Sequence, residues 1–117
     1  MKRTREALKA EGFGVLTEID LKAAFREKLG RDFPNYVILG ACNPALAYRA
    51  ISAEPVVGLL LPCNVTVEED TSRETIVRLV DPISLLGQAA PGVTGVLTEV
   101  AAEASARLER VGKALRP

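Results

Sequence analysis

The stretch Tyr36–Pro44, whose sequence is YVILGACNP, predicts a strand that passes directly into a helix. Residues 36–42 form a short apolar run, which is typical of a buried strand. Asn43 follows as a helix cap, because its side-chain oxygen can accept a hydrogen bond from the first turn of a helix. Pro44 then takes the first helical position, where proline is favoured. We expect this helix to end just before Pro55, which cannot continue it.

Helices and strands are predicted to alternate on both sides of this stretch. On the N-terminal side, Gly12 ends a first helix and Asp20 caps a second. On the C-terminal side, the longest apolar run predicts a central strand. The last segment carries an apolar stripe at helical spacing, formed by Leu97, Val100, Ala104, Leu108, Val111 and Leu115. The predicted elements are helices over 2–11, 21–29, 44–53 and 94–115, strands over 13–19, 36–42, 56–67 and 75–80, a hairpin turn over 68–74, and a short helical turn over 81–87. This order predicts an α+β domain of two layers, in which a mixed, mostly antiparallel sheet packs against helices.

Length and composition limit the classes of protein to which the chain can belong. A chain of 117 residues, 48% of them hydrophobic, is expected to form a single domain over residues 1–117 with a real core. Lys and Arg together number 15, as do Asp and Glu, so the net charge is zero and nucleic acid is not an expected partner. The chain contains no histidine, which excludes Ser-His-Asp and Cys-His catalysis within one chain.

The chain shows no sign of insertion into a membrane or of secretion. No apolar stretch reaches the roughly 18 residues that a membrane span needs. The N-terminus is charged, with Lys2, Arg3 and Arg5, and no apolar signal core follows it. We therefore expect a cytoplasmic protein without a membrane partner, whose thiols are kept reduced.

The only two cysteines are each followed by asparagine, in Cys42-Asn43 and Cys63-Asn64. Cys42 lies beside a predicted helix N-terminus, where the helix dipole and free N–H groups favour a thiolate. Its pKa is therefore expected to fall, and Cys42 would be a reactive thiol or part of an anion- or substrate-binding corner. The alternative is that Cys42 is a small apolar side chain that fits a tight junction between strand and helix.

Cys63 also has two interpretations. Strand alternation places its side chain on an apolar face and predicts an inert core residue; the neighbours on this face are Leu59, Leu61, Val65 and Val67. Pro62 cannot donate a hydrogen bond to a ladder, however, so the strand is expected to be at an edge or bulged there. A bulge could direct Cys63 toward a site. Asn64 points to the opposite face, where it could meet solvent or a ligand.

A redox pair and a metal site are weaker hypotheses. The two cysteines are not in a C-x-x-C motif, and sequence does not give the distance between their Cα atoms. Two thiols without histidine fall short of the four ligands that zinc usually takes, although a dimer could supply four thiolates. We therefore expect neither a metal nor another cofactor.

Several segments resemble a family of bacterial and archaeal domains of unknown function that is numbered 302. The segments that carry the resemblance are 11–20, 28–30, 36–44 and 58–65. The resemblance extends over nearly the whole chain and implies a small cytosolic α+β domain, similar in layout to TATA-binding-protein-like folds, that forms a homodimer. It implies no established activity. Members of the family usually begin with an extra strand and turn, whereas Met1 lies almost at the first helix here. The resemblance thus predicts a sheet with one strand missing and association through the unpaired edge.

Three hypotheses for the function follow. The first is a domain that binds or senses a small molecule or an anion, with its site at Cys42, Asn43, Pro62, Cys63 and Asn64. The second is a thiol-dependent enzyme of sulfur or disulfide transfer, in which Cys42 is the nucleophile. The third is a structural or interaction module without chemistry, in which both Cys-Asn turns serve packing.

Overall fold

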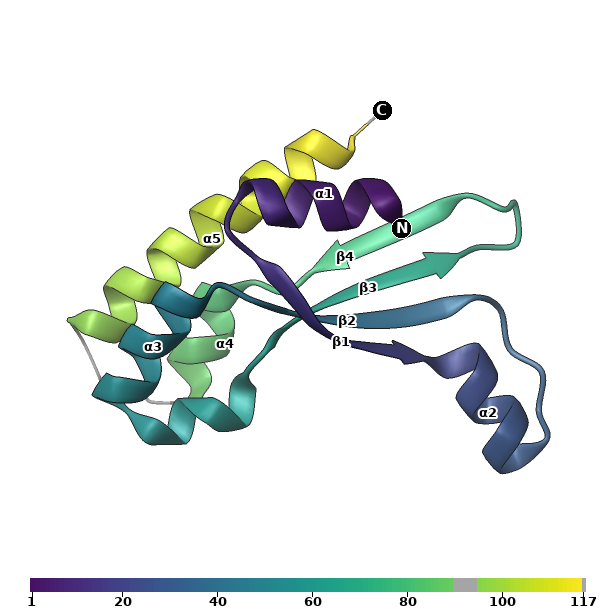
Figure 1. The fold of residues 1–117 in the computed structure, drawn as a ribbon, viewed down its shortest axis with the longest axis horizontal. Helices are drawn as coiled ribbons and strands as arrows, with labels where there is room; N and C mark the ends of the chain where they lie inside the picture. The colour runs from purple at the N-terminus through teal and green to yellow at the C-terminus, as the bar shows by residue number, and fades with distance from the viewer. Residues whose placement is uncertain (90–94, 117) are drawn as a thin grey trace.

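The computed structural model describes residues 1–89 and 95–116 (Figure 1). The helices are α1 (Lys2–Ala10), α2 (Leu21–Leu29), α3 (Pro44–Ala53), α4 (Pro82–Ala89) and α5 (Val96–Leu115), with a 3₁₀ helix η1 (Pro55–Leu60). The strands are β1 (Gly14–Asp20), β2 (Tyr36–Cys42), β3 (Cys63–Glu69) and β4 (Thr75–Leu79). The predicted α+β fold is therefore confirmed. The predicted helix start at residue 94 lies outside the described residues.

The four strands form one sheet in the order β1-β2-β3-β4. All three neighbouring pairs are antiparallel, so the parallel pairing that a mixed sheet implies is not found among the described strands. Each strand pairs with the next in sequence, and the chain reverses direction at each connection. In the β2–β3 register, Ala41 is opposite Cys63 and Gly40 is opposite Asn64. This register brings the two Cys-Asn pairs to the same end of the sheet.

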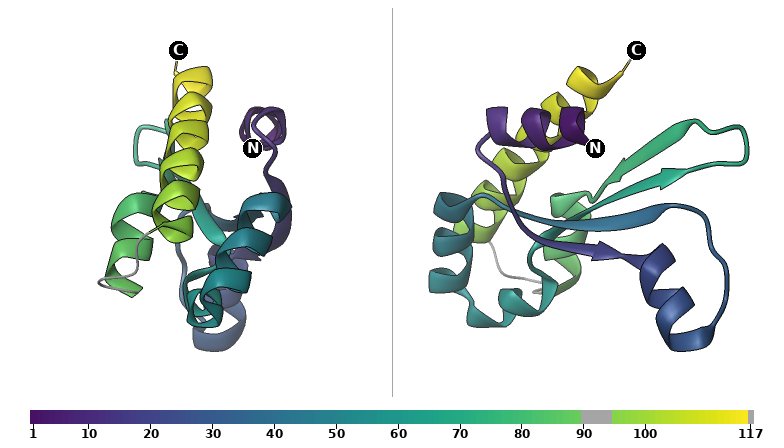
Figure 2. Two further views of the ribbon diagram at one scale, coloured as in Figure 1. Left: turned by 90° about the vertical axis from the view of Figure 1, so that its left-hand side faces the viewer. Right: turned by 45° about the vertical axis from the view of Figure 1, so that its right-hand side comes forward.

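Helix α5 joins two hydrophobic clusters. In the first, α1 and the C-terminal half of α5 cover one face of the sheet, and the buried residues are Leu8, Phe13, Leu39, Ala41, Val65, Val67, Leu108 and Val111. In the second, the N-terminal half of α5 packs with α3, η1 and α4, and the buried residues are Leu46, Ala50, Val57, Leu86, Leu97, Val100, Ala101 and Ala104. Figure 2 shows α5 running past both groups of elements. The apolar stripe predicted for this helix therefore faces both parts of the core.

The predicted strand over 56–67 is wrong in its first half. Residues 55–60 form η1, and β3 begins only at Cys63. A continuous apolar run does not distinguish a strand from a buried helical turn by its periodicity. The predicted common face of Leu59 and Cys63 is therefore also wrong, since Leu59 is 83% exposed and Cys63 is buried. Val65 and Val67 do share the buried face with Cys63.

Pro62 precedes β3 and does not lie in a bulge of that strand. β3 is an interior strand between β2 and β4, so the predicted edge or bulge at Pro62 is wrong. A proline without an N–H group is accepted here because the ladder begins at the next residue. The irregularity of the sheet lies instead in β1, where the register shifts between Val15 and Thr17.

The part of the chain that the structure describes contains no helix with the length and apolar character needed to cross a membrane. Its longest helix, α5, has 20 residues and carries charged residues along its exposed side, among them Glu99 and Lys113.

Candidate functional site

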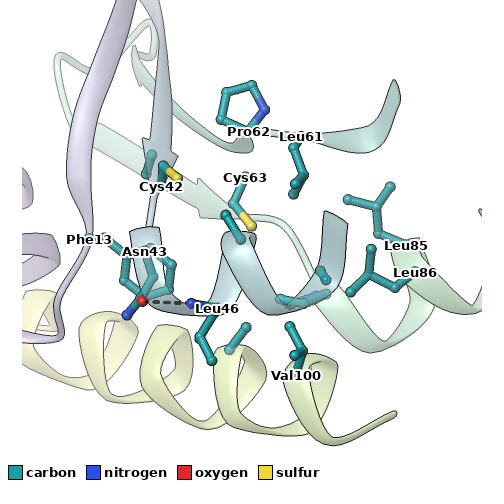
Figure 3. A pocket seen from close by; sticks show the side chains of 15 residues that line it. Phe13, Cys42, Asn43, Leu46, Leu61, Pro62, Cys63, Leu85, Leu86 and Val100 are labelled. Atoms are coloured by element: carbon teal, nitrogen blue, oxygen red, sulfur yellow. Dashed lines mark hydrogen bonds between the residues drawn. The ribbon is translucent and has the colours of Figure 1, made fainter. Parts of the chain in front are cut away.

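A cavity lies where β2 ends and α3 begins, beside the residues that precede β3 (Figure 3). We call it the inner cavity; its lining residues are Phe13, Ala41, Cys42, Asn43, Leu46, Ala47, Ala50, Leu61, Pro62, Cys63, Pro82, Leu85, Leu86, Val100 and Ala104. It therefore brings together the ends of two strands and three helices. Four of the five residues predicted to form a site line this cavity: Cys42, Asn43, Pro62 and Cys63.

Asn43 acts as the predicted cap of α3. Its Oδ1 accepts a hydrogen bond from the backbone N–H of Leu46 at 3.2 Å, drawn in Figure 3. Its backbone oxygen accepts from the N–H of Ala47 at 2.9 Å, and Pro44 has no N–H to offer. Of the first four helix residues, only Ala45 keeps an N–H group without a partner in this network. The predicted anion-binding corner therefore has few donors left.

Gly12, in the turn after α1, lies directly against the side-chain amide of Asn43. It has a φ of +84°, and a Cβ at this position would lie 2.9 Å from Nδ2 of Asn43. The neighbouring Arg107 donates from Nη1 to the backbone oxygen of Glu11 at 2.9 Å. The turn between α1 and β1 is thus fixed against both α3 and α5. Sequence reasoning identified Gly12 only as the end of a helix and missed its contact with Asn43.

The two thiols lie close together at the wall of the inner cavity, and neither is in a disulfide. Burial raises the pKa of the Cys42 thiol. Burial also raises the pKa of Cys63, and the nearby Cys42 raises it further. The predicted fall in the pKa of Cys42 is therefore wrong, because the loss of solvent disfavours the charged thiolate. Both thiols are protonated at neutral pH and are poor nucleophiles in that form.

Asn64 lies outside the inner cavity. Strand alternation turns its side chain away from the buried face on which Cys63 lies, and Asn64 is exposed. It lines a neighbouring hollow, which we call the outer groove and which has a volume of about 250 Å³. The residues of the outer groove are Leu59, Leu60, Leu61, Pro62, Asn64, Val80 and Leu85. The predicted site is thus divided between two adjoining hollows.

The inner cavity is small and apolar. Its volume is about 40 Å³, whereas one water molecule needs roughly 10–15 Å³. Its described lining contains no charged side chain, and the polar groups are one amide and two protonated thiols. Across residues 1–89 and 95–116, no three His, Cys, Asp or Glu side chains gather closely enough to hold a metal ion. The chemistry of the cavity therefore suits an uncharged apolar group of a few atoms.

Part of the lining was not predicted as a site. Phe13, Leu85 and Leu86 carry no local signal for a site, because they reach the cavity only through the packing of α4 and of the turn after α1. Val100 and Ala104 were predicted as members of the apolar stripe of α5. For this part of the lining, that stripe is the signal in the sequence that could have pointed to the cavity wall.

A family model described as "Domain of unknown function DUF302" matches residues 1–115. The chain belongs to the DUF302 family. Its fold is similar to that in "Crystal structure of uncharacterized conserved protein DUF302 from Bacillus stearothermophilus", with a TM-score of 0.84 and 35% sequence identity. The match covers 98% of this DUF302 chain and 87% of that chain. Among curated proteins, no significant match to this DUF302 chain is found.

Proposed function

We propose that this DUF302 chain is a small-molecule-binding domain of the cytoplasm, whose ligand places an uncharged apolar group in the inner cavity. The observation that carries the proposal is the cavity itself, with its lining of apolar side chains and protonated thiols. Each methylene moved from water into such a lining contributes about 0.8 kcal/mol. A charged group would lose its hydration without gaining an ionic partner. The ligand is therefore neutral in the part that enters the cavity.

The two other hypotheses receive less support. A thiol-transfer enzyme needs a nucleophile with a lowered pKa, whereas burial raises the pKa of both Cys42 and Cys63. A purely structural module would have no use for a hollow beside the two thiols, because close packing without voids stabilises a core better. It is nevertheless the alternative against which the proposal must be tested.

Xenon is a suitable first probe, because it enters apolar cavities without a hydrogen-bond requirement. Ala47 is half-buried in the cavity wall, so Ala47→Met should fill the cavity with its own side chain. Ala45 is exposed on the same helix, and Ala45→Met is the matched control. We expect xenon to shift the amide NMR signals of Cys42 and Cys63 in the parent and in the control, and not in Ala47→Met.

Native mass spectrometry of protein purified from the cytoplasm then tests the biological ligand. A bound mass in the parent and in Ala45→Met that is lost in Ala47→Met would identify the molecule and support the proposal. Absence of xenon shifts in the parent, or equal shifts in Ala47→Met, would overturn the proposed site. If the chain carries no bound mass and also fails to bind xenon, the structural module is the hypothesis that remains.

A further inference from the structure

The inner cavity and the outer groove share a wall. Leu61, Pro62 and Leu85 line both hollows. The two hollows therefore adjoin, and a ligand that occupied both would pass along these three side chains. Small-molecule sites usually have volumes of about 300–1,000 Å³. The inner cavity alone, at about 40 Å³, is far below this range, and the outer groove, at about 250 Å³, brings the combined volume close to its lower end.

Strand geometry gives the two hollows different chemistry. Cys63 and Asn64 are consecutive in β3 and point to opposite faces of the sheet, so one reaches the inner cavity and the other the outer groove. Pro62 lies at the boundary, and its ring packs against Gly40 of the adjacent strand. The apolar end and the polar end of the combined site are thus lined by two consecutive residues, Cys63 and Asn64.

Asn64 determines what the outer groove can recognise. Its side-chain amide can both donate and accept hydrogen bonds. The residues that line the outer groove in the structure include no charged side chain, and the remaining members are aliphatic or proline. A carboxylate or ammonium head would find no ionic partner there, while an amide or a hydroxyl could pair with Asn64.

We propose that the ligand is an amphipathic molecule with a short aliphatic tail and an uncharged hydrogen-bonding head. The tail lies in the inner cavity among the two thiols and the apolar side chains, and the head lies in the outer groove at Asn64. Binding is non-covalent and leaves both thiols intact. This inference rests on the proposed function, since it uses the inner cavity as the site of the tail.

Primary n-alkyl amides from acetamide to octanamide provide the test, with binding measured by NMR titration. Affinity is expected to rise by about fourfold for each methylene until the inner cavity is full, and then to level off. Asn64→Ala should weaken the binding of the preferred amide by about 2- to 12-fold, the value of one neutral hydrogen bond. Asn35→Ala, which removes another exposed asparagine, is the control and should leave the affinity unchanged.

The two proposals fail in distinguishable ways. If xenon binds as expected but tail length or Asn64→Ala has no effect on amide affinity, the amphipathic ligand is ruled out and the inner cavity stands. Equal affinity for alkyl carboxylates or alkylammonium ions of the same length would rule out the uncharged head. Xenon binding that persists unchanged in Ala47→Met would remove the basis of both proposals. Retained xenon binding in Asn64→Ala shows that this variant is folded.

Discussion

The ring of Pro62 lies directly against Gly40, and a Cβ on Gly40 would stand 2.8 Å from Cγ of Pro62. The side chain of Thr17 approaches the same position from β1. Gly40 lies in the interior strand β2 and is buried. Because Gly40 has no side chain, Thr17 of β1 and Pro62 can both pack against β2 at this position. This contact holds Pro62 at the wall between the inner cavity and the outer groove.

Gly40→Ala is expected to destabilise the protein by about 1–3 kcal/mol, the usual cost of overpacking a filled site. The sign of this stability change is informative, because replacing glycine by alanine at an unstrained position normally stabilises a protein by about 0.4–1 kcal/mol. Gly58→Ala is the matched control, since no atom lies within 4 Å of its added Cβ. Urea denaturation of both variants measures the difference. A Gly40→Ala variant as stable as Gly58→Ala would contradict the contact.

Asn43→Ala removes the cap of α3 and should cost about 1 kcal/mol of the free energy of unfolding. Asn43→Ser retains an oxygen acceptor for the N–H of Leu46 and should recover most of this loss. Thermal or urea unfolding of the two variants provides the comparison. If serine is no better than alanine, the hydrogen bond to Leu46 does not stabilise the helix start.

Both thiols should react slowly with iodoacetamide at about pH 7, because burial keeps the pKa of Cys42 and Cys63 above the ordinary value of 9.0. Unfolding in urea should raise the rate for both, and free glutathione serves as the reference. A folded-state rate above that of glutathione at neutral pH would overturn the assignment of protonated thiols and restore the thiol-enzyme hypothesis.

The same pKa shifts make stability depend on pH in a defined direction. The folded state holds the thiol protons more tightly than the unfolded state, so the unfolded chain releases protons first as the pH rises. The contribution to stability is complete below about pH 8, and is lost as the pH passes through and above the ordinary thiol pKa. A Cys42→Ser, Cys63→Ser double variant should lose less stability between pH 8 and about pH 10. Parallel curves for the parent and the double variant would contradict the raised pKa values.

Two arginines of α5 reach Glu11 in different ways and should differ in importance. Arg107 donates to the backbone oxygen of Glu11 in a partly buried position, whereas Arg110 pairs with its carboxylate at 2.8 Å and is itself more than half exposed. Arg107→Ala should cost about 1 kcal/mol, and the loss is lessened because the buried Nε that this change removes has no hydrogen-bond partner. Arg110→Ala should cost less than about 0.5 kcal/mol. Equal losses in urea denaturation would show that the backbone contact has no special role.

The homodimer predicted from the sequence can be tested at the edge strand β1. This strand exposes Leu16 and Ile19, at 67% and 47%, and has a free edge in the described sheet. If copies associate here, Leu16→Lys should yield a monomer in sedimentation at micromolar concentration. Leu59→Lys alters an exposed leucine on η1 and should leave the dimer intact. A parent chain that sediments as a monomer at the highest concentration would end the proposal.

The starts of two helices could be predicted from the sequence, because a few adjacent residues determine them. Asp20 accepts from the N–H of Ala23 at 3.1 Å, and Asn43 accepts from that of Leu46 at 3.2 Å. The stripe of α5 was also predictable, since helical spacing alone places its apolar residues on one side. Five of its six predicted members are buried and Leu115 is half-buried; the buried ones are Leu97, Val100, Ala104, Leu108 and Val111.

Other features depend on packing that no local pattern contains. Val57 is fully buried and Leu59 almost fully exposed within one apolar run, so hydrophobicity alone could not reveal η1. A fall in the pKa of Cys42 was predicted from the helix dipole, whereas burial in the folded chain raises this pKa. Likewise, Leu85 and Leu86 complete the inner cavity only because α4 folds back onto η1 and α5.

The packing of α1 along α5 has a consequence for chain connectivity. Arg3 donates to the backbone oxygen of Ala114 at 3.4 Å, and Met1 and Leu115 line one shared groove, so the two ends of the chain are neighbours in space (Figures 1 and 2). A short glycine-serine linker could therefore join them without distorting either helix. New ends could then be opened in the turn between β3 and β4. Such a circular permutant would bury the same residues, although its helices and strands would be synthesised in a different order.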